Sequence, residues 1–144
     1  MSYFSPRTDS ARERALDLPV ALSGERAARL FFESCFAQTD PAVETLFVAH
    51  LDDQARCIHL TCHDGDPCGT DFPLRSILLD AALHDSRGIV LAHNHPSGDP
   101  RPSAADQATT RRFATASEAI DLTLVDHLVT GGGEWSSFRR MGLL

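Results

Sequence analysis

The segment Gly88–Ala92 constrains the fold more than any other part of this sequence. After the glycine come four consecutive apolar residues, Ile89-Val90-Leu91-Ala92, and a polar loop follows at once. A strand without apolar–polar alternation is typical of the buried interior of a sheet that helices cover. We therefore expect a central strand here, ending at His93.

Helices and further strands alternate around that segment. Three stretches favour helices: one with Ser23 as N-cap and an apolar face of Ala27, Ala28, Phe31 and Cys35, ending before Asp40-Pro41; one with apolar residues at Leu74, Ile77, Leu78, Ala81 and Ala82; and one from Ser103 to about Ala119. The expected strands are Leu46–Ala49 and Arg56–Cys62, which form a hairpin, and Leu122–Val129 and Trp135–Phe138, which flank a turn at Gly131–Gly133. This order predicts an α/β protein with a mixed sheet covered by helices.

Length and charge limit the classes of protein that remain. The chain has 144 residues, enough for one domain with its own core, and its net charge is −7. No apolar stretch approaches the roughly 18–20 residues that span a bilayer, and the first 19 residues lack the apolar run of a secretory signal. We therefore expect a cytoplasmic protein without a membrane partner. The acidic balance also predicts that DNA binding is not strong, because phosphate contacts require a surplus of basic side chains.

The cysteines do not form a recognisable metal motif. Cys35, Cys57, Cys62 and Cys68 contain no CxxC pair, and their spacing does not match a zinc ribbon or finger. We expect buried or half-buried thiols, while a labile disulfide or a metal site that includes His59 or His63 stays open.

The richest cluster of chemically active residues follows the central strand. His93 and His95 are two residues apart, and Ser103 and Asp106 follow in the pattern HxH-x7-S-x2-D. Two imidazoles and one carboxylate are the ligands of a three-residue zinc site whose fourth position stays open for water, as in catalytic zinc centres. The same residues also have a structural role available to them, since Ser103 and Asp106 have nearly the spacing of a capping box.

The segment from Leu91 to Phe113 resembles the JAB/MPN (JAMM-motif) metalloproteins, and in particular the RadC branch. The end of the chain, from Asp126-His127-Leu128-Val129 to Gly142-Leu143-Leu144, is similar to the end of a RadC domain. The resemblance covers residues 23–144 and leaves residues 1–22 as an N-terminal arm, with no room there for the helix-hairpin-helix module of longer RadC proteins. It implies a three-layer α/β/α fold of the cytidine-deaminase-like type, with one zinc ion bound by His93, His95 and Asp106.

The resemblance also implies a hydrolytic mechanism. Glu44, before the first long strand, matches the family's glutamate and would be the general base, and Ser103 would stabilise the oxyanion. The implied function is a metallohydrolase that cleaves peptide or isopeptide bonds in a peptide or protein substrate. Asp126 and His127 are either supports for this site or packed strand residues, and Trp135 is either a core anchor or part of a substrate groove.

Two further classes of zinc enzyme require motifs that this chain lacks. A zinc nucleoside deaminase needs H-x-E and P-C-x-x-C, and a metalloprotease of the HExxH type needs that motif on a helix. The remaining alternative is a non-catalytic MPN-type scaffold or a DNA-repair-associated accessory protein. A homo-oligomer stays open, because the sequence does not set the oligomeric state.

Overall fold

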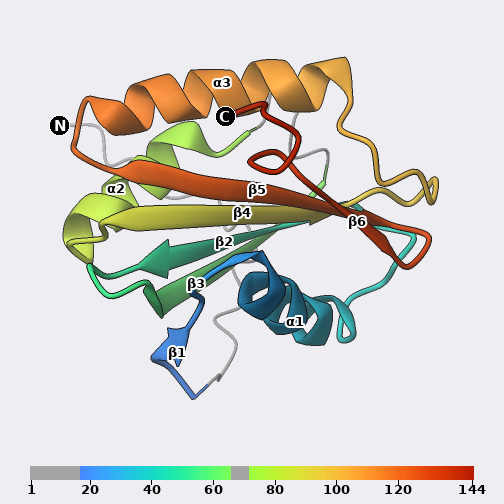
Figure 1. Cartoon of the computed structure of the whole chain (residues 1–144), viewed down its shortest axis with the longest axis horizontal. Coiled ribbons are helices and arrows are strands. Elements are labelled where there is room, and N and C mark those ends of the chain that lie inside the picture. The colour runs from blue at the N-terminus through green and yellow to red at the C-terminus, as the bar shows by residue number, and fades with distance from the viewer. Residues whose placement is uncertain (1–16, 66–71) are drawn as a thin grey trace, which may run out of the picture.

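The computed structural model describes residues 17–65 and 72–144 and contains one mixed six-stranded sheet with three helices (Figure 1). The elements in chain order are β1 (Val20–Ala21), α1 (Glu25–Phe36), β2 (Thr45–Leu51), β3 (Arg56–Asp64), α2 (Leu74–Leu83), β4 (Gly88–Asn94), α3 (Ala104–Glu118), β5 (Thr123–Gly131) and β6 (Glu134–Ser137). The strands lie in the order β1-β3-β2-β4-β5-β6, and β4 and β5 form the parallel pair. The expected α/β class and mixed sheet are confirmed.

Helices cover both faces of this sheet, as a three-layer arrangement requires. On one face, Phe32 of α1 packs with Phe47 and Val90, and on the other, Ile77 of α2 and Phe113 of α3 pack with Leu91. In Figure 1, α1 lies below the sheet and α3 above it. Along β4, the side chains of Ile89, Val90, Leu91 and Ala92 are at most 1% exposed. The apolar run is therefore the buried central strand that its lack of alternation predicts.

The first helix begins differently from the expectation. Gly24, not Ser23, is the N-cap, with φ 90° and no side-chain hydrogen bond at the cap. The buried face of α1 consists of Ala28, Phe32 and Cys35, while Phe31 is only partly buried. The predicted N-cap was wrong. The chain needs a positive φ at the residue that precedes this helix, and glycine adopts such a φ readily.

Residues 1–16 of the predicted arm and Cys68 lie outside the described residues, whereas Val20–Ala21 pairs with β3 and Leu22 is buried. Cys35, Cys57 and Cys62 are buried, as expected. Trp135 packs against the core, with its ring centroid 6.1 Å from that of Phe36, so it serves as an anchor of the β5–β6 hairpin. No helix in the described ranges is long and apolar enough to cross a membrane.

Candidate metal centre

Three candidate ligands converge where β4 ends. His93 lies within β4, His95 follows in the loop, and Asp106 is in the first turn of α3. The two Nε2 atoms of the histidines are 3.0 Å apart, and Asp106 Oδ2 lies 3.0 Å from His95 Nε2. Asp106 Oδ1 lies 3.4 Å from His93 Nε2. The sequence spacing therefore produces one compact group of two imidazoles and a carboxylate.

The second nitrogen of each imidazole is engaged elsewhere. His95 Nδ1 donates to the backbone carbonyl of Asp99 at 2.7 Å, and His93 Nδ1 lies 2.7 Å from His127 Nε2. These contacts fix both rings and leave both Nε2 atoms facing Asp106. Metal-binding histidines are commonly oriented in this way, through a hydrogen bond at the nitrogen that does not bind the metal.

His127 is both a packed strand residue and a neighbour of the candidate ligands. It is fully buried on β5, its Nδ1 lies 2.7 Å from Thr110 Oγ1 on α3, and its ring stacks on Phe138. Burial, and then the nearby His93, hold the pKa of His127 well below its ordinary value. A neutral His127 can accept from His93 Nδ1–H while it donates to Thr110, so it orients His93. Asp126, in contrast, accepts hydrogen bonds from Ser137 and from the backbone of His127 and Arg139.

Ser103 and Asp106 form the capping box that their spacing predicts. Ser103 Oγ accepts from the Asp106 N–H at 3.0 Å, and Asp106 Oδ2 accepts from the Ser103 N–H at 2.8 Å. The cap uses Ser103 Oγ only as an acceptor, so the cap leaves the hydroxyl hydrogen available to donate another hydrogen bond. Asp106 likewise contributes Oδ2 to the cap while both carboxylate oxygens face the histidines. The structural and chemical interpretations of these two residues are therefore compatible.

Asn94 holds the segment that carries Glu44, and the sequence analysis missed this role. Its side-chain oxygen accepts from the Thr45 N–H at 2.7 Å, and its side-chain nitrogen donates to the Val43 carbonyl at 3.0 Å. These bonds join the residues on both sides of Glu44 to the end of β4. The position of Asn94 between two ligands could have indicated this, because the middle residue of a strand triplet points to the opposite face.

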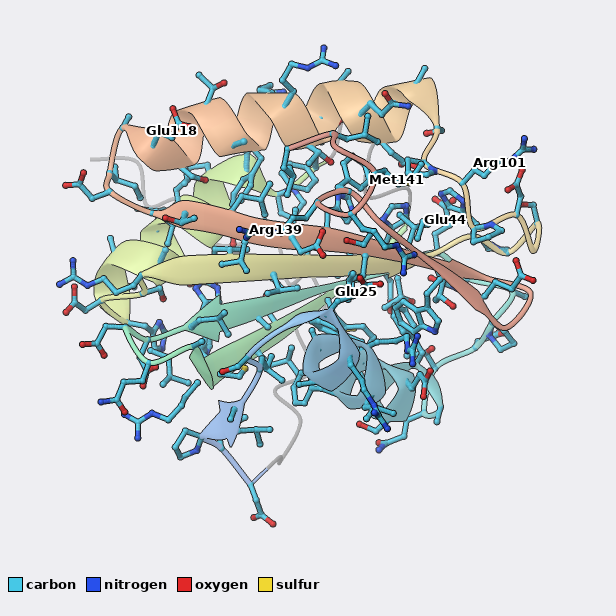
Figure 2. The ribbon with its side chains drawn as sticks, viewed as in Figure 1. Glu25, Glu44, Arg101, Glu118, Arg139 and Met141 are labelled. Carbon is cyan, nitrogen blue, oxygen red and sulfur yellow. The ribbon has the colours of Figure 1, made fainter. Side chains whose placement is uncertain are left out.

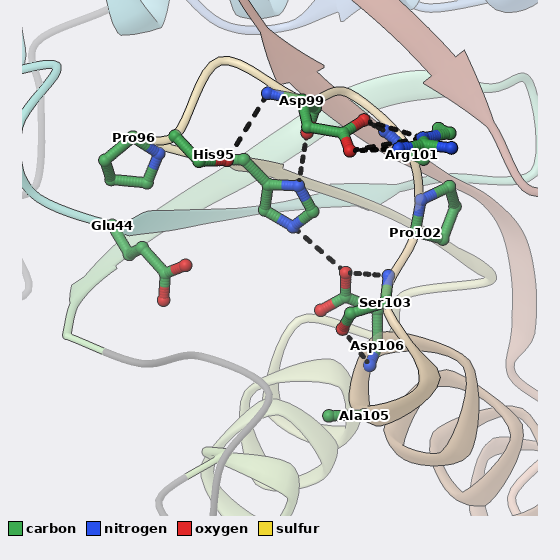
Figure 3. Close-up of a pocket in the computed structure, with 10 residues that line it drawn as sticks. Glu44, His95, Pro96, Asp99, Arg101, Pro102, Ser103, Ala105 and Asp106 are labelled. Atoms are coloured by element: carbon green, nitrogen blue, oxygen red, sulfur yellow. Dashed lines mark hydrogen bonds and ion pairs between the residues drawn. The ribbon is translucent and has the colours of Figure 1, made fainter.

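Glu44, His95, Ser103 and Asp106 line one cavity of about 590 Å³. Figure 3 shows the Glu44 side chain across the cavity from His95 and Asp106. Figure 2 places Glu44 at the same end of the sheet as Arg101. Arg101 lies on the outer part of the loop that follows β4. Arg101 pairs with Asp99 and holds the pKa of that carboxyl at about 2. The predicted base and the predicted oxyanion donor thus border the same space as two of the predicted ligands.

The turn between β5 and β6 shapes the loop that carries His95. A Cβ atom on Gly131 would lie 2.9 Å from the backbone of Gly98, and one on Gly132 would lie 2.8 Å from the Gly98 carbonyl oxygen. The His95 N–H also donates to the Thr130 carbonyl at 2.8 Å. The glycines of this turn therefore permit a close approach that positions the loop.

The donor set fits a divalent transition metal. Two neutral imidazoles and one carboxylate, with ligand atoms within 4.8 Å of one another, are the ligands of many catalytic zinc sites. A fourth position of a tetrahedral site would remain for water or substrate.

The layered α/β fold and the His–His–Asp group at the end of its central strand define a protein of the JAB/MPN type. A family model described as "RadC-like JAB domain" matches residues 22–143. The chain belongs to this family, and the resemblance seen in its sequence is confirmed.

Curated relatives support the same assignment. The chain is 38% identical over 104 residues to a UPF0758 protein of Xanthomonas axonopodis pv. citri (strain 306), covering 72% of this chain and 46% of that protein. It is 34% identical over 126 residues to UPF0758 protein YfjY of Escherichia coli (strain K12), covering 87% of this chain and 78% of that protein. A UPF0758 protein of Chloroflexus aurantiacus is 34% identical over 146 residues, with 90% and 64% covered. The chain thus spans about half the length of the Xanthomonas relative.

Proposed function

We propose that this domain is a zinc-dependent hydrolase of the JAMM type that cleaves peptide or isopeptide bonds. The proposal rests on one observation: the candidate ligands, the predicted base and the predicted hydrogen-bond donor lie together. His95 and Asp106 line one cavity together with Glu44 and Ser103. The buried His93 is the third member of the ligand group. Membership of the JAB family adds support, because proteins of this family can be hydrolytic.

The chain's own residues supply ligands, a base and a hydrogen-bond donor. A zinc ion bound by His93, His95 and Asp106 would lower the pKa of a water molecule to about 7 and so provide a nucleophile at neutral pH. Glu44 accepts the proton of the attacking water and returns it to the leaving nitrogen of the cleaved amide. The Ser103 hydroxyl donates a hydrogen bond to the oxyanion of the tetrahedral intermediate.

The cavity suits a polypeptide substrate. Its rim includes the exposed side chains of Ser97 and Arg101, so it is bordered by solvent and not enclosed. An extended peptide can enter such a site with its flanking residues outside. This is the basis for proposing a peptide or protein as the partner of this site.

The first test combines metal analysis with a peptide-library cleavage screen of the full chain. Substituting Asp106 by Ala should remove one zinc ion per chain and abolish cleavage. Glu44→Gln preserves size but removes the base, so bound zinc should remain while turnover falls about 10²–10⁴-fold.

The results separate the hydrolase from the alternative functions. An Asp106→Ala protein that kept all its zinc would contradict the assigned ligands, and an active Glu44→Gln protein would contradict the assigned base. A wild-type protein that binds zinc but cleaves nothing in the screen would favour the scaffold or DNA-repair accessory function.

A further inference from the structure

A second group of metal-binding side chains lies at the other end of the same sheet. His50 of β2 is directly opposite His59 of β3, and Asp80 of α2 completes the group. One ligand atom from each of the three residues lies within 4.8 Å of the others. Three elements that are separate along the chain thus bring two imidazoles and one carboxylate together.

This group is separate from the candidate metal centre. His50 pairs with Ile89 at the start of β4, whereas His93 lies four positions further along that strand. Four strand residues correspond to about 13 Å. In Figure 1 the start of β4 lies beside α2, at the end of the sheet opposite the loop that follows β4.

His50 carries a buried nitrogen without a hydrogen-bond partner among the described residues. The residue is 0% exposed, and its Nδ1 lies 3.0 Å from Ser86 Oγ. Its Nε2 is buried and makes no hydrogen bond within the part of the chain that the structure describes. Burying a polar atom without a partner is unfavourable, and native structures rarely do so without a reason. Because Ser86 engages Nδ1, Nε2 is the nitrogen that remains for a metal ion.

The charge state of His50 also favours metal binding. Burial, together with the nearby His59 and His84, lowers the pKa of His50 to about 3. Burial therefore favours the uncharged ring, which is the form of histidine that binds metal ions. Asp80 adds a carboxylate, the only acidic member of the group.

His84 supports the geometry from the end of α2. Its Nδ1 donates to the Asp80 carbonyl at 2.8 Å. Its ring stacks on that of His59, with centroids 3.9 Å apart and planes 14° apart. These contacts orient the His59 ring next to Asp80, as supporting residues commonly do for metal-binding histidines.

We propose that His50, His59 and Asp80 bind a second zinc ion. Imidazole and carboxylate ligands suit zinc, and a three-residue set leaves a fourth position for water. The ion would link α2 to the β2–β3 hairpin and so stabilise the folded chain. This site goes beyond the proposed hydrolase and does not depend on it.

The test is equilibrium dialysis of the full chain against zinc chloride, followed by metal analysis. The wild-type protein should bind two zinc ions, and Asp80→Ala and His59→Gln should each bind one. Both changes are at partly exposed positions, and alanine is well tolerated within a helix, so these variants should fold. Asp85→Asn is the matched control. It removes an exposed carboxylate just after α2, at a φ of 52° that asparagine tolerates, and should keep two ions.

A second measurement reports the proposed structural role. Zinc that binds only the folded state raises the melting temperature. In an Asp106→Ala background, which lacks the first site, zinc should still raise it, and adding Asp80→Ala should abolish that rise. Circular dichroism without zinc shows whether each variant is folded.

Different results would contradict the two proposed metal sites. A wild-type protein that binds one ion, lost in Asp106→Ala, would overturn the second site and leave the hydrolase proposal intact. Two ions retained by both Asp80→Ala and His59→Gln would also overturn it. Loss of an ion in these two variants with none lost in Asp106→Ala would support the second site and contradict the first.

Discussion

Individual residues in this domain combine structural and chemical roles. Asp106 accepts a hydrogen bond from the Ser103 N–H at the start of α3 and also faces both histidines. The carboxylate is 4% exposed, and the capping bond fixes its rotamer before any ligand arrives. The capping box and the candidate metal ligand therefore share the same atoms, so a substitution must be tested for both effects.

Ser103→Ala distinguishes those effects. Loss of the cap alone should lower the free energy of unfolding by about 1 kcal/mol and leave turnover per folded molecule nearly unchanged. Loss of an oxyanion donor should also reduce kcat about 10²–10³-fold. Melting temperature and kcat measured on the same samples separate the two.

Ser103→Thr serves as the control, because threonine keeps both the hydroxyl and the capping oxygen. The Ser103→Thr protein should keep most of the wild-type activity. A Ser103→Ala protein that loses stability only would limit the serine to a structural role.

Cys57 provides a prediction about reactivity. Burial raises the pKa of its thiol to about 11, so the thiolate fraction at pH 8 is about 10⁻³. Alkylation by iodoacetamide in the folded protein should therefore be slow at pH 8 and should increase as the pH rises toward 11. Mass spectrometry of the Cys57 peptide, with the urea-unfolded chain as control, measures this. Equal labelling rates in the folded and unfolded protein would contradict it.

At the scale of elements, the candidate metal centre depends on contacts between segments that are distant in the chain. Asn94 joins β4 to the Glu44 segment, and the Gly131–Gly132 turn supports the loop that carries His95. Neither contact involves a ligand atom of the candidate metal centre. Both instead affect the separation between Glu44, the proposed general base, and the candidate ligands.

Asn94→Ala should disturb the Glu44 segment without removing metal. Two hydrogen bonds are lost, each worth about 1 kcal/mol, so the segment should become more mobile. We expect faster amide exchange at Thr45 and a lower kcat, with zinc content unchanged.

Gln54→Ala, in the exposed β2–β3 turn, is the matched control. It should change neither the amide exchange at Thr45 nor kcat. Normal protection of Thr45 in Asn94→Ala would show that the two bonds do not hold the segment.

Across the whole molecule, acidic side chains outnumber basic ones. The net charge is −7, and all 13 basic residues are arginines. Affinity of this chain for duplex DNA should therefore be weak and should fall steeply with salt. Fluorescence anisotropy with a labelled duplex checks this. Nanomolar binding at physiological salt would instead favour the DNA-repair accessory function.

Sequence alone determined the layered α/β architecture and the members of the main candidate site. The apolar run of β4 is long enough to identify a buried strand, and HxH-x7-S-x2-D is local enough to place its residues around one loop and one helix start. Local patterns of this kind depend on backbone periodicity and short spacings, so they can be read without knowing the rest of the fold. The cap of α1 was mispredicted for the complementary reason, since its glycine conformation depends on how the chain enters from β1.

Which distant residues meet depends on the packing of the whole fold. His127 reaches His93 through the pairing of β4 with β5, and Thr110 reaches His127 through the packing of α3. Asn94 holds both neighbours of Glu44 from a distant part of the chain. The group of His50, His59 and Asp80 arises in the same way, from the register of β2 with β3 and the position of α2. Strand register and helix placement follow from burial of the whole core, so no short stretch of the sequence contains these contacts.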